Sequence, residues 1–369
     1  MQEIKTIDLD AMLEYAVKME ATDIHLTVGS KPMLRLQSFL QPIESLKTVS
    51  PETTREIADS CLDCERIDLL KKNGVVDSSF SRNGLGRFRI NIFKQRGTYA
   101  VAIRIQPFII PKFDSLGLPL VIKNFARLKK GLVLITGVTG SGKSTTLASL
   151  IDVINEERQC HVITVEDPIE YLHKHKRSIV NQREIGLDAP TFQIALRSIL
   201  REDPDVILIG EMRDMESISI ALTAAETGHL VFSTLHTVGA AKTVDRIIDN
   251  FPPNQQNQIR NQLATVLEGV VSQQLVPSSD RSRLIPVTEV MVVNPAVRNL
   301  IREGKPHMLN SIIQTGAQEG MHSLEANLAE LCLKDLITRE EGFSRAQDKQ
   351  YFQQFLAKGG KHEHANIYI

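Results

Sequence analysis

The sequence predicts a two-domain protein whose larger domain has an α/β fold with a mostly parallel sheet. The main observation is a series of short, apolar, β-branched runs that alternate with helical segments, at residues 132–135, 161–165, 205–209 and 230–234. Continuous apolar runs of this kind are typical of strands that are covered on both faces. The length of 369 residues exceeds the size at which a single hydrophobic core usually stops growing, so a second, smaller domain is expected.

The smaller domain is expected at residues 1–106 as a mixture of helices and strands. Apolar residues recur every three or four positions across residues 9–19, which predicts an amphipathic helix. Polar and apolar residues alternate at 23–28, which predicts a half-buried strand, and a further strand is expected at 33–39. Together these elements indicate an α+β domain.

Two further segments of the smaller domain carry residues that could have a functional role. Residues 86–97 and 99–105 alternate on either side of a turn, which predicts a hairpin with arginines on one face. Cys61 and Cys64 form a CxxC pair without a second pair, whereas a structural zinc site needs four nitrogen or sulfur ligands. We therefore expect no metal there, and both cysteines in one helix at 53–72.

Three prolines between residues 107 and 119 predict an extended linker between the domains. The larger domain is expected at 120–356, with a mainly helical portion from about residue 254. The final segment, 357–369, is largely polar and contains glycine, so we expect a flexible tail.

Composition and charge exclude several classes of protein. With 42% hydrophobic and 24% charged residues, the chain has no apolar run long enough to cross a bilayer. The N-terminal sequence MQEIKTIDLD is acidic and polar, unlike a signal peptide, so a cytoplasmic location is expected. A formal net charge of -1 gives no overall attraction for nucleic acid, and no nucleic-acid partner is expected.

Residues 137–144 match the phosphate-binding pattern GxxxxGK[ST] and lie between a predicted strand and a predicted helix. Glycines let backbone N–H groups approach the phosphates, and the helix N-terminus adds positive potential. We expect Lys143 to reach the β- and γ-phosphate oxygens and Ser144 to bind Mg2+. The motif therefore predicts ATP and Mg2+ as cofactors. The expected nucleotide-binding residues are Gly137, Thr139, Gly140, Ser141, Gly142, Lys143, Ser144 and Thr145.

Carboxylates follow two of the predicted strands. The strand at 205–209 is followed by Glu211, which has the general form of a Walker B acid. Such an acid faces the crevice at the carboxyl edge of an open α/β sheet, so Glu211 is expected to hold Mg2+ or its water. A second acidic loop contains Glu166, Asp167 and Glu170. A carboxylate there is suited to orient or deprotonate the water that attacks the γ-phosphate, although in isolation a solvated turn explains the pattern better.

His229 and His236 stand at the two ends of the strand predicted at 230–234. They are seven residues apart and face opposite sides of a strand, which argues against joint binding of one metal. A lone histidine at a strand end is more often a simple hydrogen-bonding residue. The alternative is that these two histidines sense the γ-phosphate.

Taken together, these motifs resemble those of the secretion-motor ATPases, and in particular the PilT-type retraction ATPases of type IV pili. The resemblance runs over nearly the whole chain. It rests on TDIHL at 22–26, GRFR at 86–89, the phosphate loop, TVEDPIE at 164–170, LREDPD at 200–205, GEMRD at 210–214, residues 227–236 and AVRNLIRE at 296–303. The last segment differs from the family signature AIRNLIRE only at Val297, which keeps an apolar side chain.

The resemblance implies a RecA-like P-loop ATPase core and a PAS-like N-terminal domain, assembled as a homo-hexameric ring. It implies that Glu211 is the Walker B acid and that Glu170 activates the attacking water. It also implies that His229 and His236 are site residues.

Ring assembly gives the arginines of the predicted hairpin a role. An arginine from one subunit can stabilise the charge that develops on the γ-phosphate held by its neighbour. Arg96 and Arg104 are the arginines expected to act in this way, although arginines on one face of a strand usually only solvate it.

The expected function is that of a hexameric motor that hydrolyses ATP to drive pilus retraction and twitching motility, at the cytoplasmic face of the inner membrane. Expected partners are an inner-membrane platform protein, through which the chain is peripheral to the membrane, and a paralogous pilus ATPase. Alternatives within the superfamily are an accessory retraction motor and a pilus-assembly or type II secretion ATPase. A non-hydrolysing ring scaffold and a nucleic-acid translocase are alternatives from other classes.

Four features favour retraction over these alternatives. Assembly and secretion relatives usually carry a four-cysteine zinc module, but no cysteine lies between Cys160 and Cys332. We also expect no long N-terminal extension of the kind that those relatives have. The nearly complete signature at 296–303 argues against the accessory motor. The intact Lys143, Glu170 and Glu211 argue against a scaffold without activity.

Overall fold

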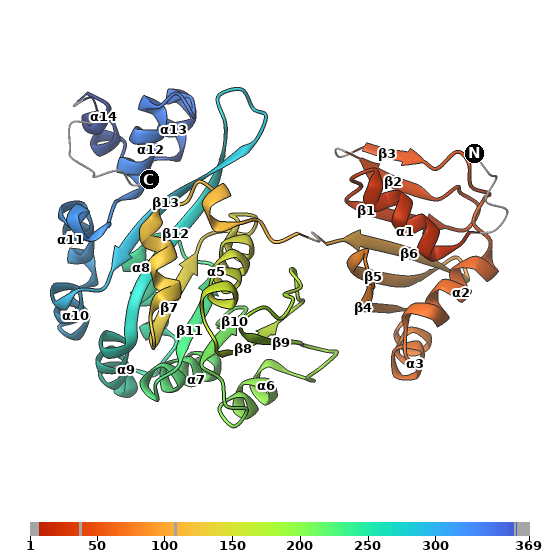
Figure 1. Cartoon of the computed structure of the whole chain (residues 1–369), viewed down its shortest axis with the longest axis horizontal. Coiled ribbons are helices and arrows are strands. Elements are labelled where there is room, and N and C mark those ends of the chain that lie inside the picture. The colour runs from red at the N-terminus through yellow and green to blue at the C-terminus, as the bar shows by residue number, and fades with distance from the viewer. Residues whose placement is uncertain (1–6, 37–38, 107–108, 358, 360–369) are drawn as a thin grey trace. The chain divides into compact units, whose positions relative to one another are not determined.

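The structure is a computed structural model that describes most of the chain, namely residues 7–36, 39–106, 109–357 and 359. The chain divides into two compact units (Figure 1). The smaller unit comprises residues 1–109 with 168–172, and the larger unit comprises residues 110–167 with 173–369. Their sheets confirm the predicted class, which is an α/β core with a smaller α+β part.

The smaller unit is a six-stranded antiparallel sheet with helices packed on one face. The strands are β1 (Asp23–Thr27), β2 (Met33–Leu36), β3 (Phe39–Pro42), β4 (Val75–Arg82), β5 (Gly86–Gln95) and β6 (Thr98–Ile105), in the order β3-β2-β1-β6-β5-β4. The helices are α1 (Leu9–Lys18), α2 (Pro51–Cys61) and α3 (Cys64–Asn73). Ile24, Ile90 and Ile103 are fully buried in the core that the sheet shares with these helices. The alternation seen in the sequence is therefore that of a sheet covered on one side.

The single helix expected at 53–72 is wrong, because the chain forms two helices there. α2 ends at Cys61, and Leu62 has extended backbone geometry. The side chain of Asp63 then accepts a hydrogen bond of 2.8 Å from the backbone N–H of Arg66, which caps the start of α3. Cys61 and Cys64 therefore belong to different helices.

The strand expected at 33–39 is also wrong in extent. β2 ends at Leu36, β3 begins at Phe39, and residues 37–38 lie outside the described part. The predicted hairpin is confirmed as β5 and β6. Arg96 and Gly97 at its turn both have positive φ, which is the geometry of a two-residue hairpin turn.

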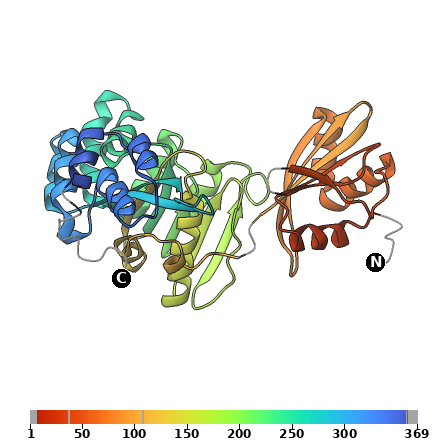
Figure 2. The ribbon, with the colours of Figure 1, turned by 90° about the horizontal axis from the view of Figure 1, so that it is seen from above.

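The larger unit is a seven-stranded, mostly parallel sheet with helices on both faces (Figure 1 and Figure 2). Its order is β13-β12-β7-β11-β10-β8-β9, and only β13 runs antiparallel to its neighbour. The strands are β7 (Gly131–Thr136), β8 (His161–Glu166), β9 (Ile179–Glu184), β10 (Val206–Ile209), β11 (Leu230–Leu235), β12 (Leu267–Pro277) and β13 (Leu284–Val292). The four predicted strands are confirmed as β7, β8, β10 and β11.

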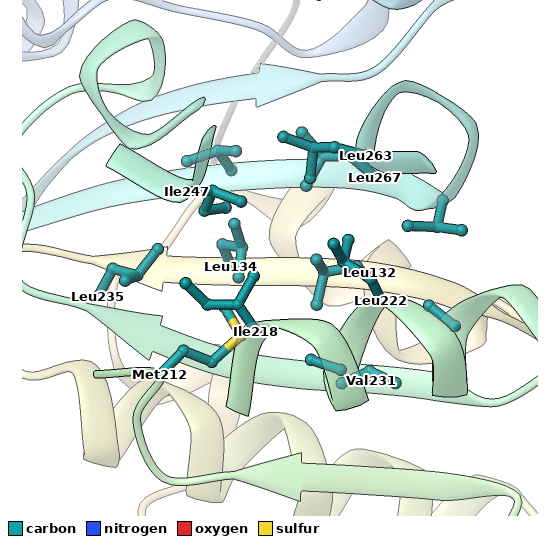
Figure 3. Packing of buried hydrophobic residues seen from close by; sticks show 14 of the residues in the cluster. Leu132, Leu134, Met212, Ile218, Leu222, Val231, Leu235, Ile247, Leu263 and Leu267 are labelled. Atoms are coloured by element: carbon teal, nitrogen blue, oxygen red, sulfur yellow. The ribbon is translucent and has the colours of Figure 1, made fainter. Parts of the chain in front are cut away.

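Two hydrophobic clusters flank this sheet. One face is covered by α4 (Leu120–Asn124) and α5 (Lys143–Glu157), and the other by α6 (Phe192–Ile199), α7 (Met215–Glu226), α8 (Ala240–Asp249) and α9 (Pro253–Val266). On the second face, Leu132 and Leu134 of β7 pack with Ile218 and Leu222 of α7 and with Leu263 of α9 (Figure 3). Alternate residues of β7 thus pack into the two clusters, which explains why the sequence of this strand is apolar on both faces.

The portion after residue 254, expected to be mainly helical, also contains β12 and β13, which are 11 and 9 residues long. They extend the parallel sheet beyond β7. The remaining helices are α10 (Pro295–Arg302), α11 (Leu309–Thr315), α12 (Leu324–Leu333), α13 (Arg339–Arg345) and α14 (Lys349–Ala357). Short 3-10 turns complete the chain as η1 (Phe113–Ser115), η2 (Phe125–Arg127), η3 (Pro306–Met308) and η4 (Ala317–Glu319). Most of the tail expected at 357–369 lies outside the described residues.

Residues 110–119 are packed on the larger unit, unlike the extended linker expected over 107–119. The side chain of Phe113 is buried in the cluster beneath α5, and Leu118 is buried with it. The hydroxyl of Ser149 in α5 donates a hydrogen bond of 2.6 Å to the carbonyl of Pro111. This stretch therefore forms part of the core that supports α5, and residues 107–108 lie outside the described part.

Candidate functional site

Three loops that carry predicted site residues leave the parallel sheet at one edge. β7 leads into the phosphate loop 137–144, β10 into Glu211, and β11 into His236. β11 lies between β7 and β10 and runs parallel to both. Because parallel strands have their carboxyl ends at the same edge, the fold brings these three loops together.

Glycines of the phosphate loop are required for two different reasons. Gly137, Gly140 and Gly142 have φ values of 142°, 80° and 85°, which side chains rarely tolerate. A Cβ atom at Gly137 would lie 2.2 Å from the carbonyl oxygen of Gln273, and one at Gly142 would lie 2.8 Å from the Nε2 of Gln273. A Cβ at Gly140 would meet nothing within 4 Å. Space limits the first and third glycines, and backbone conformation limits all three.

Lys143 is the first residue of α5, and its ammonium group folds back onto the phosphate loop. Nζ donates hydrogen bonds of 2.7 Å to the carbonyl of Gly137 and 3.0 Å to that of Val138. The side chain of Ser141 is buried, and its Oγ has no hydrogen-bond partner in the described part of the chain. The first N–H groups of α5 also lack partners within the helix. These donors converge on one loop and fit a phosphate group.

Glu211 is held by two basic side chains at the same edge. Its carboxylate forms an ion pair with Arg213 and lies 3.1 Å from the Nε2 of His236. Burial, followed by the positive charges of Lys143 and Arg213, lowers the pKa of His236 below its usual value. His236 is therefore mainly neutral at pH 7, and Lys143 contributes to the same electrostatic cluster.

The residues at this edge fit a magnesium ion. Mg2+ prefers oxygen ligands, and the hydroxyl of Ser144 and the carboxylate of Glu211 are of that type. Ser144 lies in the first turn of α5, next to Lys143. Arg213 now neutralises Glu211, so a cation bound by this carboxylate would take over the role of the guanidinium group.

Hydrogen bonds hold the two ends of the acidic loop that follows β8. The Oε1 of Glu166 accepts hydrogen bonds of 2.7 Å from the hydroxyl of Thr164 and 3.2 Å from the Nε2 of Gln182. The Oε1 of Gln182 accepts a bond of 2.8 Å from the backbone N–H of His173. Glu170, between these anchors, is exposed, and its expected catalytic role stays a prediction.

The far side of the same loop is attached to α5. Asn155 is fully buried, and its Nδ2 donates to the carbonyl of Lys174 at 2.7 Å while its Oδ1 accepts from the N–H of Lys176 at 3.1 Å. The Nζ of Lys176 lies 2.6 Å from Asp152 and 2.8 Å from Glu156, both in α5. The helix that begins at the phosphate loop thus also fixes the segment that follows Glu170.

His229 does not join the other site residues. It precedes β11, at the opposite edge of the sheet from His236, and a strand of this length places the two about 20 Å apart. Its Nδ1 lies 2.9 Å from the carbonyl of Ala224 and 3.1 Å from the hydroxyl of Thr227. Within one chain His229 is a local hydrogen-bonding residue, and its expected contact with the γ-phosphate stays a prediction.

The two expected trans-acting arginines lie in the smaller unit. Arg96 is exposed at the turn between β5 and β6. The Nε of Arg104 lies 3.0 Å from a carboxylate oxygen of Asp23, although 68% of the Arg104 side chain remains exposed. Their action on a neighbouring subunit stays a prediction.

Sequence reasoning missed two residues of this edge. Arg213 lies in the recognised segment 210–214 but was given no role, and only the ion pair with Glu211 reveals one. Gln273 lies in a portion expected to be helical, so nothing pointed to its contact with the phosphate loop.

Among the residues that the structure describes, no helix is both long and apolar enough to span a membrane.

Comparisons with known proteins agree with this geometry. Residues 116–341 match the family described as type II/IV secretion system protein. The type IV pilus retraction ATPase PilT of Pseudomonas aeruginosa is 42% identical over 346 residues, which cover 94% of this chain and 100% of that protein. The type IV pilus ATPase PilU of the same organism is 35% identical and is aligned over 96% of this chain and 93% of its own.

A solved structure extends the similarity to three dimensions. A crystal structure of the pilus retraction motor PilT with bound ADP matches with a TM-score of 0.88 at 44% identity, and covers 95% of this chain and 100% of that one. The match confirms the predicted fold and the resemblance inferred from the motifs. The chain therefore belongs to the type II/IV secretion system protein family, as a PilT-like member of it.

Proposed function

We propose that this protein is an ATP-hydrolysing motor that drives type IV pilus retraction as a homo-hexameric ring. The observation that carries the proposal is the meeting of the phosphate loop, Glu211 and His236 at one edge of the sheet. The relatives named as retraction ATPase and retraction motor, the latter with bound ADP, support the same conclusion. Identity is higher to PilT, at 42%, than to PilU, at 35%, which favours retraction over the accessory role.

The proposed chemistry assigns one task to each group of residues. The phosphate loop and Lys143 bind the β- and γ-phosphates, and Ser144 and Glu211 would hold Mg2+, which neutralises phosphate charge when bound. Glu170 orients or deprotonates the attacking water. Arg96 or Arg104 of a neighbouring subunit stabilises the charge that develops on the γ-phosphate.

Contacts within the chain stabilise the charged groups of this edge. The ammonium of Lys143 is bonded to the carbonyls of Gly137 and Val138, and the carboxylate of Glu211 is paired with Arg213. Nucleotide binding therefore exchanges protein contacts for phosphate contacts. If Arg104 is the arginine that acts on a neighbour, it would have to exchange its ion pair with Asp23 for the phosphate contact.

The remaining parts of the proposal concern location and partners. We place the ring in the cytoplasm, at the cytoplasmic face of the inner membrane. There it docks on the inner-membrane platform protein of the pilus machine, and a paralogous pilus ATPase is a further partner, as the pair PilT and PilU in one relative's organism suggests.

Measurements of ATP binding and of ATP turnover distinguish the roles proposed for Lys143, Glu211 and Glu170. Lys143→Ala is expected to abolish ATP binding, whereas Glu211→Ala and Glu170→Gln are expected to bind ATP but lose turnover. Equilibrium nucleotide binding and steady-state ATPase of the purified hexamer measure both. Normal ATPase from Glu170→Gln would remove that residue from the catalytic step.

Two further assays test the ring and the cellular role. Hexamers mixed from Lys143→Ala and Arg104→Ala subunits report whether sites are shared, and shared sites predict partial recovery of ATPase. Deletion of the gene should abolish twitching motility and increase the number of surface pili. A decrease in pili would instead indicate an assembly ATPase.

A further inference from the structure

Gln273 of β12 holds two parts of the nucleotide loop with one side chain. It is 5% exposed. Its Nε2 donates a hydrogen bond of 2.9 Å to the carbonyl of Ser141, and its Oε1 accepts one of 2.8 Å from the hydroxyl of Thr146 in α5. Both ends of the carboxamide are therefore used, and both contact the segment that would surround the phosphates.

The phosphate loop needs an external support of this kind. Its N–H groups must point toward the phosphates, so carbonyl groups turn away from them and require donors elsewhere. Ser141 lies between Gly140 and Gly142, which have the largest conformational freedom of any residue. A hydrogen bond to the Ser141 carbonyl restricts the loop at its most mobile point, before any ligand is bound.

Backbone and side chain of Gln273 act on both ends of the loop. Its carbonyl oxygen occupies the space beside Gly137, and its Nε2 occupies the space beside Gly142. The preceding residue, Ser272, accepts a hydrogen bond of 2.9 Å from the N–H of Gly239, in the loop that follows His236. Adjacent residues of a strand face opposite sides, so β12 reaches the phosphate loop on one face and the histidine loop on the other.

We infer that Gln273 is a positioning residue for nucleotide binding, which keeps the phosphate loop in its binding conformation through Ser141 and Thr146. The inference rests on the proposed function, because it requires that the loop binds nucleotide. A buried glutamine that only satisfies core hydrogen bonds would affect stability instead. The two roles differ in what they do to affinity.

Gln273→Leu and Gln274→Leu form a matched pair on one strand. Gln274 is half-buried, and its side chain makes no hydrogen bond in the described part of the chain. The loss of two hydrogen bonds from Gln273→Leu is expected to weaken ADP binding to the full-length protein about 10-fold. Gln274→Leu is expected to leave it within about 2-fold. Isothermal titration gives the affinity, and the melting temperature without ligand gives the effect on folding.

Gln273→Glu keeps the volume and adds a second readout. Its carboxylate still accepts from Thr146 but cannot donate to Ser141, whereas the protonated acid can donate again. Burial disfavours the charged form. The affinity of Gln273→Glu relative to the wild type should therefore recover as the pH falls, which a structural role would not produce.

The possible results distinguish failure of the positioning role of Gln273 from failure of the proposed function. Wild-type protein that binds ADP while Gln273→Leu and Gln273→Glu bind it equally well would refute the positioning role alone. A lower melting temperature for Gln273→Leu with unchanged ADP affinity would also refute it. Wild-type protein without affinity for ADP or ATP would refute the proposed function together with this inference.

Discussion

Replacement of Gly137 by alanine tests whether the phosphate loop is limited by space or only by backbone conformation. The new Cβ would lie 2.2 Å from the carbonyl oxygen of Gln273 and 2.7 Å from the Oγ of Ser141. The first of these atoms belongs to the backbone of a buried strand, which cannot move cheaply. Gly186 offers a matched control in the same unit, because its φ of 83° is also positive and its Cβ would meet nothing within 4 Å.

The two substitutions differ in both of their costs. An alanine with positive φ costs about 1–2 kcal/mol at Gly186, and it costs more at Gly137, because a φ of 142° lies beyond the left-handed region that side chains tolerate. Only Gly137→Ala adds the cost of overpacking, which is about 1–3 kcal/mol. If the loop shifts to relieve the contact, that additional free energy appears as a loss of nucleotide affinity of about 5- to 150-fold.

Titration of both variants with ADP, together with denaturant unfolding, measures the affinity and the free energy of unfolding. Gly186→Ala should lose about 1–2 kcal/mol of stability and no affinity. Gly137→Ala should show the additional loss in affinity, in stability or in both. If the two variants behave alike in both measurements, the close approach of β12 to the phosphate loop is not a constraint and the reasoning is refuted.

Three further changes test other contacts. Asn155→Leu leaves two backbone groups without their partner, so we expect a loss of about 2–4 kcal/mol in denaturant unfolding and a lower ATPase rate at unchanged ADP affinity. Arg298→Met removes contacts to the carboxyl end of α9 and to Glu268 and should lower the free energy of unfolding by about 1–3 kcal/mol. Arg302→Met, on the exposed face of α10, should lower it by less than about 0.5 kcal/mol. Equal losses of stability in the two variants would contradict this assignment. Burial lowers the pKa of His173 to about 4, so the unfolded chain binds a proton first as the pH falls. Stability should therefore be complete above about pH 6.5 and fall by up to about 3 kcal/mol toward pH 4, and His173→Gln should reduce this dependence when unfolding is followed across the pH range.

Local features of this chain were predictable because they depend on neighbouring residues. The phosphate loop lies between a strand and a helix that adjoin it directly, so spacing alone located Lys143 at the start of α5. Glu211 and His236 each follow an apolar run, and the carboxyl ends of parallel strands share an edge, so both residues fall at the edge of the phosphate loop. The sequence did not predict the contact between them, in which the two side chains are 3.1 Å apart.

Contacts between distant segments were not predictable in the same way. The hydrogen bond between Gln273 and Ser141 joins residues 132 positions apart, and β12 carries two glutamines that weaken its resemblance to a buried strand. Helices on either side of β12 and β13 further favoured a helical interpretation. The sequence already placed His229 and His236 at opposite ends of one strand, and the parallel pairing of β11 with β7 puts His229 at the edge away from the phosphate loop.

The structure assigns part of the signature at 296–303 to packing. Val297 and Ile301 are fully buried. Arg298 donates to the carbonyls of Ala264 and Thr265 at the end of α9, at 2.8 and 2.9 Å, and thus neutralises the carboxyl end of that helix. Arg302 lies on the exposed face of α10, which takes no part in this packing.

The contacts around the phosphate loop also suggest how occupancy of the site reaches the rest of the larger unit. Lys143, which would bind the phosphates, contacts the carbonyl of Gly137, and Gly137 packs against Gln273 of β12. Glu211, which would hold the cation, contacts His236, whose loop is bonded to β12 through Gly239 and Ser272. Both routes meet on β12, which pairs with β13 beneath the C-terminal helices. Because one strand receives both signals, the loops are expected to respond to nucleotide together rather than separately.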